Sequence, residues 1–219
     1  MSIVDLGIKV ENDTNDKGLV QPITDINKIN KMADILKKQK NGERNWLLFI
    51  IGINTGLRVS DYTSMTVGQF REIVERGYII IVPSKTDKRK LNEDGQLVGK
   101  YKKVRIDISE SLRECISKYI EGHYDFEYMF PSNKGGTPLK RQTVWLMLNE
   151  AAKEAGITEN IGAHSMRKTF GYWHYQKNHD VRLLMEIFQH SSEDVTLRYI
   201  GVNAEKMKES MKNMSLGIE

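Results

Sequence analysis

The sequence predicts an α+β protein that is mainly α-helical and contains a small antiparallel β-sheet. Two observations carry this prediction. Apolar residues recur at helical spacing before residue 55 and again after residue 109, whereas β-branched and alternating runs occur only near the middle of the chain. A length of 219 residues suits one large domain, and 39% hydrophobic with 28% charged residues is typical of globular proteins.

The first two helices are expected before residue 55. Thr24 or Asp25 can cap the first helix, and Gly42 would end it. The apolar residues of this helix are Ile26, Ile29, Met32, Ala33 and Leu36. The second helix, over 43–54, is apolar on nearly all sides, so we expect it at the centre of the core.

The helical pattern breaks at Thr55-Gly56, after which Ser60 or Asp61 could cap a further short helix. The remaining helices are expected in the last half of the chain. They cover roughly 110–121, 141–155, 164–177 and 181–189.

Two strands are expected over 78–82 and 101–108, and we expect them to pair as an antiparallel sheet. The connection between them is basic. From Lys85 to Arg105 the chain carries eight basic and three acidic residues, a net charge of +5, while the whole chain carries +4. Such a concentration is typical either of a surface that binds phosphates or of a solvated hairpin.

The predicted domain covers 24–203 and has a flanking segment on each side. Residues 1–23 are polar and show no sustained period, which predicts a flexible N-terminal arm. Residues 204–219 predict a helical tail on which Met207, Met211 and Met214 form an apolar stripe. Packing of this stripe on the core of its own domain is the simplest interpretation.

Several classes of protein are excluded by composition and motif. The longest apolar run, 46–53, is far shorter than the ~20 residues of a membrane helix. A single cysteine, Cys115, permits no intrachain disulfide and suits a reducing cytosol. The histidines form no His-Glu-x-x-His pattern, and Gly135-Gly136 lacks the ending of a nucleotide-phosphate loop. We therefore expect a soluble, cytoplasmic protein with no metal or cofactor.

Three separated stretches place groups that suit a phosphate beside a turn or a helix start. They are TGLRVSD around Arg58, GAHSMRKTFGYWH with His164 and Arg167, and FQHSSEDVTLRYIG with His190 and Tyr199. A guanidinium is planar, always charged and able to hold two phosphate oxygens at once. A tyrosine has a free pKa of about 10, so it needs positive neighbours and a proton acceptor to attack phosphorus. Taken singly, each of these residues could equally be structural.

Together the three stretches resemble the motifs of the tyrosine recombinases, the phage-integrase family. In this chain, Thr55-Gly56-Leu57-Arg58 resembles the first arginine box of the family. Residues 164–167 resemble its second box, which has the pattern His-x-x-Arg. The third is a His nine residues before a Tyr, here His190 and Tyr199. The resemblance covers about residues 24–210 and implies the catalytic-domain fold of this family.

The resemblance implies a role for each of these residues. Arg58, Arg167 and His190 would bind the scissile phosphate, and His164 would act as a general base or a hydrogen-bonding partner. Tyr199 would attack the phosphate to give a 3′-phosphotyrosyl link and a free 5′-hydroxyl.

The family also uses a lysine from the hairpin of the sheet to protonate the leaving oxygen. Lys85 fits this position at the end of a strand, and Lys88 or Lys90 is the alternative donor. Gln189 departs from the family pattern, which usually has Gly before the His of the third box.

The partner implied by the resemblance is double-stranded DNA. Basic residues of the connection are the candidate DNA contacts: Lys88, Arg89, Lys90, Lys100, Lys102 and Lys103. The family assembles on DNA as a homo-oligomer, a tetramer in synapsis, and the isolated chain could be a monomer. In the family the segment after the nucleophile often docks on a neighbouring subunit, which offers a second interpretation of the methionine stripe, with Gly201 supplying the bend.

The function implied is that of a site-specific DNA recombinase or integrase of a phage or mobile element. Two alternatives remain open: a type IB topoisomerase-like enzyme that nicks and closes DNA, and a recombinase-like regulator that binds DNA without cutting it. The family usually carries a helical core-binding domain of roughly one hundred residues before the catalytic domain. Without that domain, the chain is either a fragment or a minimal recombinase.

Overall fold

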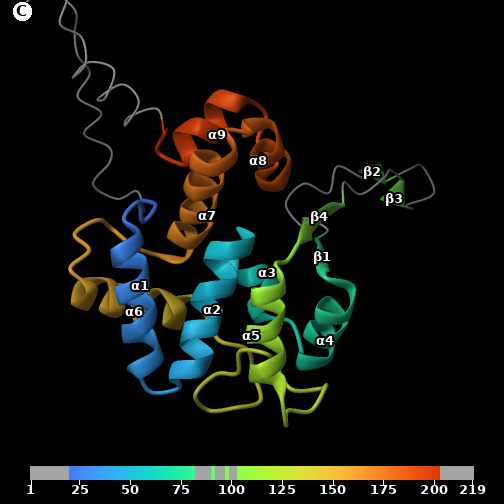
Figure 1. Cartoon of the computed structure of the whole chain (residues 1–219). Helices are drawn as coiled ribbons and strands as arrows, with labels where there is room; N and C mark the ends of the chain where they lie inside the picture. The colour runs from blue at the N-terminus through green and yellow to red at the C-terminus, as the bar shows by residue number, and fades with distance from the viewer. Residues whose placement is uncertain (1–19, 82–89, 92–96, 99–102, 203–219) are drawn as a thin grey trace, which may run out of the picture.

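The computed structural model describes residues 20–81, 90–91, 97–98 and 103–202. These residues form a mainly helical fold with two short antiparallel strand pairs (Figure 1). The predicted class, mainly α-helical with a small antiparallel sheet, is confirmed.

Helix α2 (Gly42–Thr55) lies at the centre of the fold (Figure 1). It packs against α1 (Ile26–Lys38), α5 (Glu110–Ile120) and α7 (Ala163–Asn178), and α1 in turn packs against α6 (Arg141–Ala155). Because α2 has neighbours on several sides, its apolar residues need not be confined to one stripe. The prediction of a central second helix is confirmed.

The turn between α1 and α2 differs from the prediction. Asp25 caps α1, because its Oδ1 accepts the Asn27 N–H at 2.8 Å. Gly42 does not end this helix but begins α2. Asn41 makes the turn in the left-handed conformation, at φ 61°, which a short polar side chain tolerates.

The sheet consists of β1 (Tyr78–Ile81) and β4 (Val104–Asp107), paired antiparallel from Tyr78 opposite Asp107 to Ile81 opposite Val104. On β4 buried and exposed side chains alternate, as the sequence predicts for a strand with one covered face. A second pair, β2 (Lys90–Leu91) with β3 (Leu97–Val98), lies within the basic connection and is not among the predicted strands.

Two helices between α2 and the sheet differ from the helices predicted from the sequence. Helix α3 (Val59–Thr63) begins two residues earlier than a cap at Ser60 would allow, because Arg58 occupies the N-cap position and both Ser60 and Asp61 lie inside the helix. Helix α4 (Val67–Arg76) is not among the predicted helices. Its signal is the Thr66/Gln69 capping box, in which Thr66 Oγ1 accepts the Gln69 N–H and Gln69 Oε1 accepts the Thr66 N–H.

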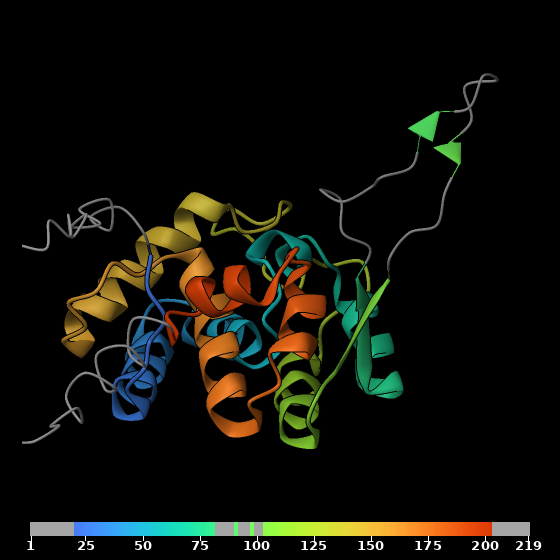
Figure 2. The same ribbon diagram turned by 90° about the horizontal axis from the view of Figure 1, so that it is seen from above.

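The C-terminal helices α7, α8 (Val181–Phe188) and α9 (Glu193–Tyr199) lie side by side (Figure 2). They enclose a small core of their own, formed by Tyr175, Leu184, Phe188, Ile200 and Val202. Helix α9 is not among the predicted helices. It is short, and Ser192 caps it by accepting the Val195 N–H.

The chain before α1 packs on α7. Ile23 is only 3% exposed. Its N–H donates to Thr169 Oγ1 at 2.9 Å, and its carbonyl accepts from Trp173 Nε1 at 3.0 Å. Residues 20–23, which the sequence pattern places in the N-terminal arm, are therefore bound to the domain. Residues 1–19 and the tail over 204–219, with Met207, Met211 and Met214, lie outside the described residues.

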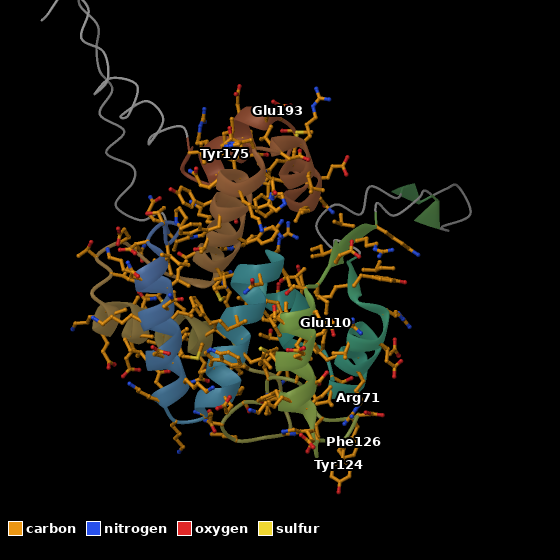
Figure 3. All side chains as sticks on the ribbon, in the orientation of Figure 1. Arg71, Glu110, Tyr124, Phe126, Tyr175 and Glu193 are labelled. Carbon is orange, nitrogen blue, oxygen red and sulfur yellow. The ribbon has the colours of Figure 1, made fainter. Side chains whose placement is uncertain are left out.

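At the other end of the molecule from α8 and α9, Tyr124 and Phe126 are exposed (Figure 3). Their rings stack with centroids 5.5 Å apart. Among the helices of the described ranges, none has the length and apolar character that a membrane span requires.

Gly171 allows α8 and α9 to approach α7. A Cβ at this position would lie 2.5 Å from Ile200 Cγ2 and 2.7 Å from the ring of Phe188. We expect Gly171→Ala to lower the free energy of unfolding by about 1–3 kcal/mol, because the added methyl overpacks this small core. Urea denaturation would measure the change. Gln176→Ala, on the exposed side of the same helix, is the control and should change stability by less than about 0.5 kcal/mol.

Candidate active site

Arg58 lies at the junction of α2 and α3. Gly56 ends α2 in the left-handed conformation, at φ 64°, and a Cβ there would overlap the ring of Phe170 on α7. The turn therefore needs glycine both for its backbone angle and for its contact with α7. The Arg58 N–H donates to Asp61 Oδ2 at 3.3 Å, and Arg58 Nη1 lies 4.0 Å from the same oxygen. Asp61 thus holds both the main chain and the guanidinium of Arg58.

Arg167 lies on α7 and is only 5% exposed. Its Nη1 donates to the Gly56 carbonyl, and its Nη2 donates to the Ile187 carbonyl at 3.3 Å. Its Cζ lies 4.4 Å from the centroid of the Phe188 ring. These contacts join the α2–α3 turn to the end of α8. Because a guanidinium has more N–H donors than these two carbonyls use, Arg167 retains donors for an anion.

His190 and Tyr199 meet at the C-terminal end of the domain. Their ring centroids are 4.9 Å apart, with the rings at 73° to each other. Phe188 contacts both rings: its ring centroid lies 5.3 Å from that of Tyr199 and 5.5 Å from that of His190. Lys168, next to Arg167 on α7, places its Nζ 5.2 Å from the centroid of the Tyr199 ring. Aromatic rings and the Lys168 ammonium group therefore contact the Tyr199 ring, while the charges of Arg167 and Arg58 act on its hydroxyl.

The pKa values of these groups show that their charges interact. Burial raises the pKa of the Tyr199 hydroxyl, while the positive charges of Arg167 and Arg58 lower it. Burial lowers the pKa of His190, and the same two arginines lower it further. Burial also lowers the pKa of Arg167 to about 10, with the charge of Tyr199 opposing this change. Arg167 stays protonated at neutral pH, and His190 is neutral.

His164 lies on the first turn of α7, and its side chain is exposed. It lines a cavity of about 230 Å³ together with Arg58, Asp61 and Arg141. His164 and Arg167 are three residues apart, but Arg167 is buried against main-chain carbonyls while His164 borders the cavity. Arg167 thus binds the α2–α3 turn through the Gly56 carbonyl, while Arg58 of that turn lines the cavity together with His164.

Of the sequence-derived candidates, the fold brings Arg58, Arg167, His190 and Tyr199 within electrostatic reach of one another, with His164 on the adjacent cavity wall. Lys85, Lys88 and Arg89 lie outside the described residues, as do Lys100 and Lys102. Lys90 is described only as part of the β2 backbone, and Lys103 is exposed beside β4.

Three residues of this region are not among the candidates from sequence. Arg141 begins α6 and reaches the cavity from a different segment of the chain. Lys168 faces the Tyr199 ring, and Thr196 lies next to His190, with its Oγ1 3.1 Å from the His190 Nδ1. The basic character of Arg141 and Lys168 is visible in the sequence, but their proximity to the cluster depends on how α6, α7 and α9 pack.

The cluster can bind an anion and place it beside a tyrosine hydroxyl. Two guanidinium groups supply fixed positive charge where negative charge would develop, which is the arrangement that stabilises a phosphoryl-transfer transition state. The neutral His190 imidazole packs against the Tyr199 ring, with the ring centroids 4.9 Å apart. The Tyr199 pKa is raised by burial, so the two arginines are needed to make the hydroxyl a nucleophile.

The two arginines should differ in their contribution to stability. We expect Arg167→Ala to lower the free energy of unfolding by about 2–5 kcal/mol, because it leaves two carbonyls without a donor, each of which costs about 1–3 kcal/mol when buried. Arg58→Ala should cost less than about 1 kcal/mol, because its partly exposed ion pair contributes little. Urea denaturation of both variants gives the comparison, and equal losses would contradict this structural role of Arg167.

Acid should destabilise the domain through two histidines. Burial lowers the pKa of both His174 and His190, so the unfolded state binds more protons than the folded state below the unfolded pKa of about 6.5. Stability is then fully present above about pH 6.5 and falls as the pH drops toward the lowered folded values. His174→Gln should flatten this dependence in urea denaturations at a series of pH values. Gln176→Ala, which removes no titratable group from an exposed position of the same helix, should leave the slope unchanged.

Known proteins are similar to this chain over most of its length. The model of the phage integrase family matches residues 23–206. A probable integrase/recombinase, YoeC of Bacillus subtilis, is 34% identical over 195 residues, which cover 89% of this chain and 96% of that protein. The tyrosine recombinase XerA of Pyrococcus furiosus is 26% identical over 191 residues, covering 86% of this chain but only 60% of the longer relative.

Solved structures share the fold. A crystal structure of XerA recombinase matches with a TM-score of 0.64 and 18% identity, covering 89% of this chain and 65% of that one. The Tn1549 transposon integrase, in complex with a circular intermediate DNA, matches with a TM-score of 0.62 and 16% identity, covering 89% and 67%. The family model, the relatives and the shared fold lead to one conclusion: the chain belongs to the phage integrase family, whose members include the tyrosine recombinases.

Proposed function

We propose that this chain is a site-specific DNA recombinase that cuts and rejoins DNA strands through a 3′-phosphotyrosyl link at Tyr199. The observation that carries the proposal is the cluster itself, in which the Tyr199 hydroxyl lies within the field of Arg58 and Arg167 and the Tyr199 ring packs against His190. The names of relatives support the same activity, because they are an integrase/recombinase and tyrosine recombinases.

Arg58 and Arg167 hold the scissile phosphate on this proposal. Arg167 is fixed by two main-chain carbonyls and Arg58 by Asp61, so neither guanidinium needs to be ordered when the phosphate arrives. Preorganised charge of this kind can contribute about 3–4 kcal/mol per donor to a transition state. His164, on the wall of the same cavity as Arg58, supplies a further hydrogen bond to the phosphate.

The surface around the cavity meets double-stranded DNA. Arg141 lies beside Arg58 and His164 and contacts a phosphate of the same strand. The basic connection supplies further phosphate contacts through the lysines and the arginine proposed from sequence: Lys88, Arg89, Lys90, Lys100, Lys102 and Lys103. Lys85 protonates the leaving 5′-oxygen, with Lys88 or Lys90 as the alternative donor.

Recombination requires two DNA sites, so the working form is a homo-oligomer on DNA, a tetramer in synapsis. The reaction takes place in the cytoplasm, on DNA associated with the nucleoid. Transesterification keeps the energy of the broken phosphodiester in the phosphotyrosine, and a free 5′-hydroxyl attacks that link to rejoin the strands. No metal or nucleotide takes part.

We expect Tyr199→Phe to abolish covalent protein–DNA adducts while the affinity for DNA stays close to that of the parent, because the ring contacts remain and only the nucleophilic oxygen is lost. The measurement uses a nicked duplex that loses a short 5′-hydroxyl fragment after cleavage, so that the adduct accumulates. Tyr124→Phe, at the far end of the molecule, is the matched control and should form adduct at the parent rate (Figure 3).

The same assay separates the alternatives. An adduct formed by Tyr199→Phe would remove Tyr199 from the role of nucleophile. A parent protein that binds DNA but never forms an adduct would indicate a regulator. Relaxation of supercoiled DNA by monomers, without any requirement for two sites, would indicate a topoisomerase-like enzyme.

A further inference from the structure

Lys168 places its side chain against the ring of Tyr199. Its Nζ lies 5.2 Å from the ring centroid, within the distance of about 6 Å at which a cation is attracted to an aromatic face. Lys168 is half-buried on α7, and Tyr199 is the last residue of α9, so the contact joins two helices. Neither the sequence motifs nor the proposed function gives this lysine a role.

The geometry of α7 explains why Arg167 and Lys168 approach Tyr199 differently. Successive residues of an α-helix point about 100° apart around the helix axis. Arg167 binds the Gly56 and Ile187 carbonyls, and its charge acts on the Tyr199 hydroxyl. Lys168 turns to the ring instead. Two adjacent residues of α7 therefore place one positive charge near the oxygen of the tyrosine and another near its ring.

Two further rings pack against Tyr199. The centroids of Phe188 and His190 lie 5.3 Å and 4.9 Å from that of Tyr199. Phe188 carries no charge, and burial together with the two arginines lowers the pKa of His190, so its imidazole is neutral at neutral pH. Among the described residues that contact this ring, Lys168 therefore supplies the positive charge.

We propose that Lys168 is a positioning residue whose ammonium group holds the Tyr199 ring and favours the phenolate that develops as this tyrosine attacks the phosphate. This inference rests on the proposed function, in which Tyr199 is the nucleophile. A phenolate spreads part of its negative charge over its ring, so a cation against the ring attracts the phenolate more strongly than the phenol. The contact strengthens as the reaction proceeds, which is the condition for a contribution to the rate.

The other charges around Tyr199 act on its oxygen. Arg167 from α7 and Arg58 from the α2–α3 turn lower the pKa of the hydroxyl, and Asp61 offsets part of the Arg58 charge by pairing with it at 4.0 Å. Both arginines are assigned to the scissile phosphate, whose negative charge weakens their effect on the tyrosine once DNA is bound. A cation that faces the ring and does not hold the phosphate keeps its effect on Tyr199 in the complex.

The step transfers protons and exchanges one bond at phosphorus. The Tyr199 oxygen forms its bond to phosphorus and gives its proton to a base, a role that the family resemblance offers to His164. The bond from phosphorus to the 5′-oxygen breaks, and that oxygen takes a proton from the acid, for which Lys85 is proposed. Lys168 forms no bond and exchanges no proton, and it remains an ammonium group throughout.

A first experiment measures the pKa of Tyr199 without DNA. The chemical shift of the ring carbon that bears the oxygen reports the phenolate, and Tyr199→Phe identifies the Tyr199 signal. Lys168→Met removes the charge but keeps an unbranched side chain that packs on a ring, and it should raise the Tyr199 pKa by about one pH unit.

Two further variants complete this titration. Lysine loses its own charge at about pH 10.4, whereas arginine stays charged, so Lys168→Arg should give a Tyr199 pKa at or below that of the parent. Lys177→Met removes the same charge from an exposed position of α7 and should leave the Tyr199 pKa unchanged.

A second experiment measures adduct formation in single turnovers on the nicked duplex. Lys168→Met should slow adduct formation about tenfold with DNA affinity and its salt dependence unchanged. Lys168→Arg should restore most of the rate, and Lys177→Met should react at the parent rate. Urea denaturation of the same variants separates a loss of folding from a loss of rate.

A chemical rescue distinguishes this role from a structural one. A ring-fluorinated tyrosine at position 199 has a more acidic hydroxyl. It should raise the adduct rate of Lys168→Met more than that of the parent, because it supplies the acidity that the lysine no longer provides. A variant that reacts slowly because its ring is misplaced would gain no more from the fluorinated tyrosine than the parent does.

Two results would overturn the inference while leaving the proposed function intact. One is a Tyr199 pKa that is the same in Lys168→Met and in the parent. The other is an adduct rate in Lys168→Met that equals the parent rate, or that falls only as far as DNA affinity falls with a flatter salt dependence, which would make Lys168 a phosphate contact. If the parent forms no adduct on any trapped duplex, the proposed function fails, and the Tyr199 pKa values still decide whether Lys168 acts on the tyrosine.

Discussion

The rest of the site depends on the hydrogen bonds that the buried guanidinium of Arg167 donates to two main-chain carbonyls. It binds the carbonyls of Gly56 and Ile187 and stacks on Phe188, so one side chain joins the α2–α3 turn, helix α7 and the end of α8. A charge this deeply buried is costly unless it is hydrogen-bonded, and the two carbonyls meet that need. The same contacts hold Arg167 beside Tyr199.

The architecture around Arg167 explains how a small chain holds a preorganised anion site. The central helix α2 supplies a large core, while α7, α8 and α9 form a smaller one that carries His190 and Tyr199. Gly56 allows the α2–α3 turn to contact α7, and Gly171 allows α8 and α9 to pack on α7 within the smaller core. Residues 20–23 bind α7, the helix that carries His164 and Arg167, through the Ile23 main chain.

The electrostatics assign different tasks to groups of similar type. Arg58 is partly exposed and is held by Asp61. Arg167 is buried, and besides supplying a charge it joins two segments of the fold through its hydrogen bonds. Tyr199 is made less acidic by burial and more acidic by both arginines. The same burial and the same charges lower the pKa of His190, so its imidazole is neutral where it packs against the Tyr199 ring.

The sequence by itself determined the fold class, the central position of α2, the strands β1 and β4, and the residues that form the cluster, because these depend on local periodicity and on motifs with recognisable spacing. It did not determine α4, α9 or the cap of α3, where short helices start from side-chain caps that periodicity does not reveal. Nor could it show Arg141, Lys168 or Thr196 beside the cluster. Only packing of α6, α7 and α9 decided their neighbours, because contacts between distant segments leave no local pattern in the chain.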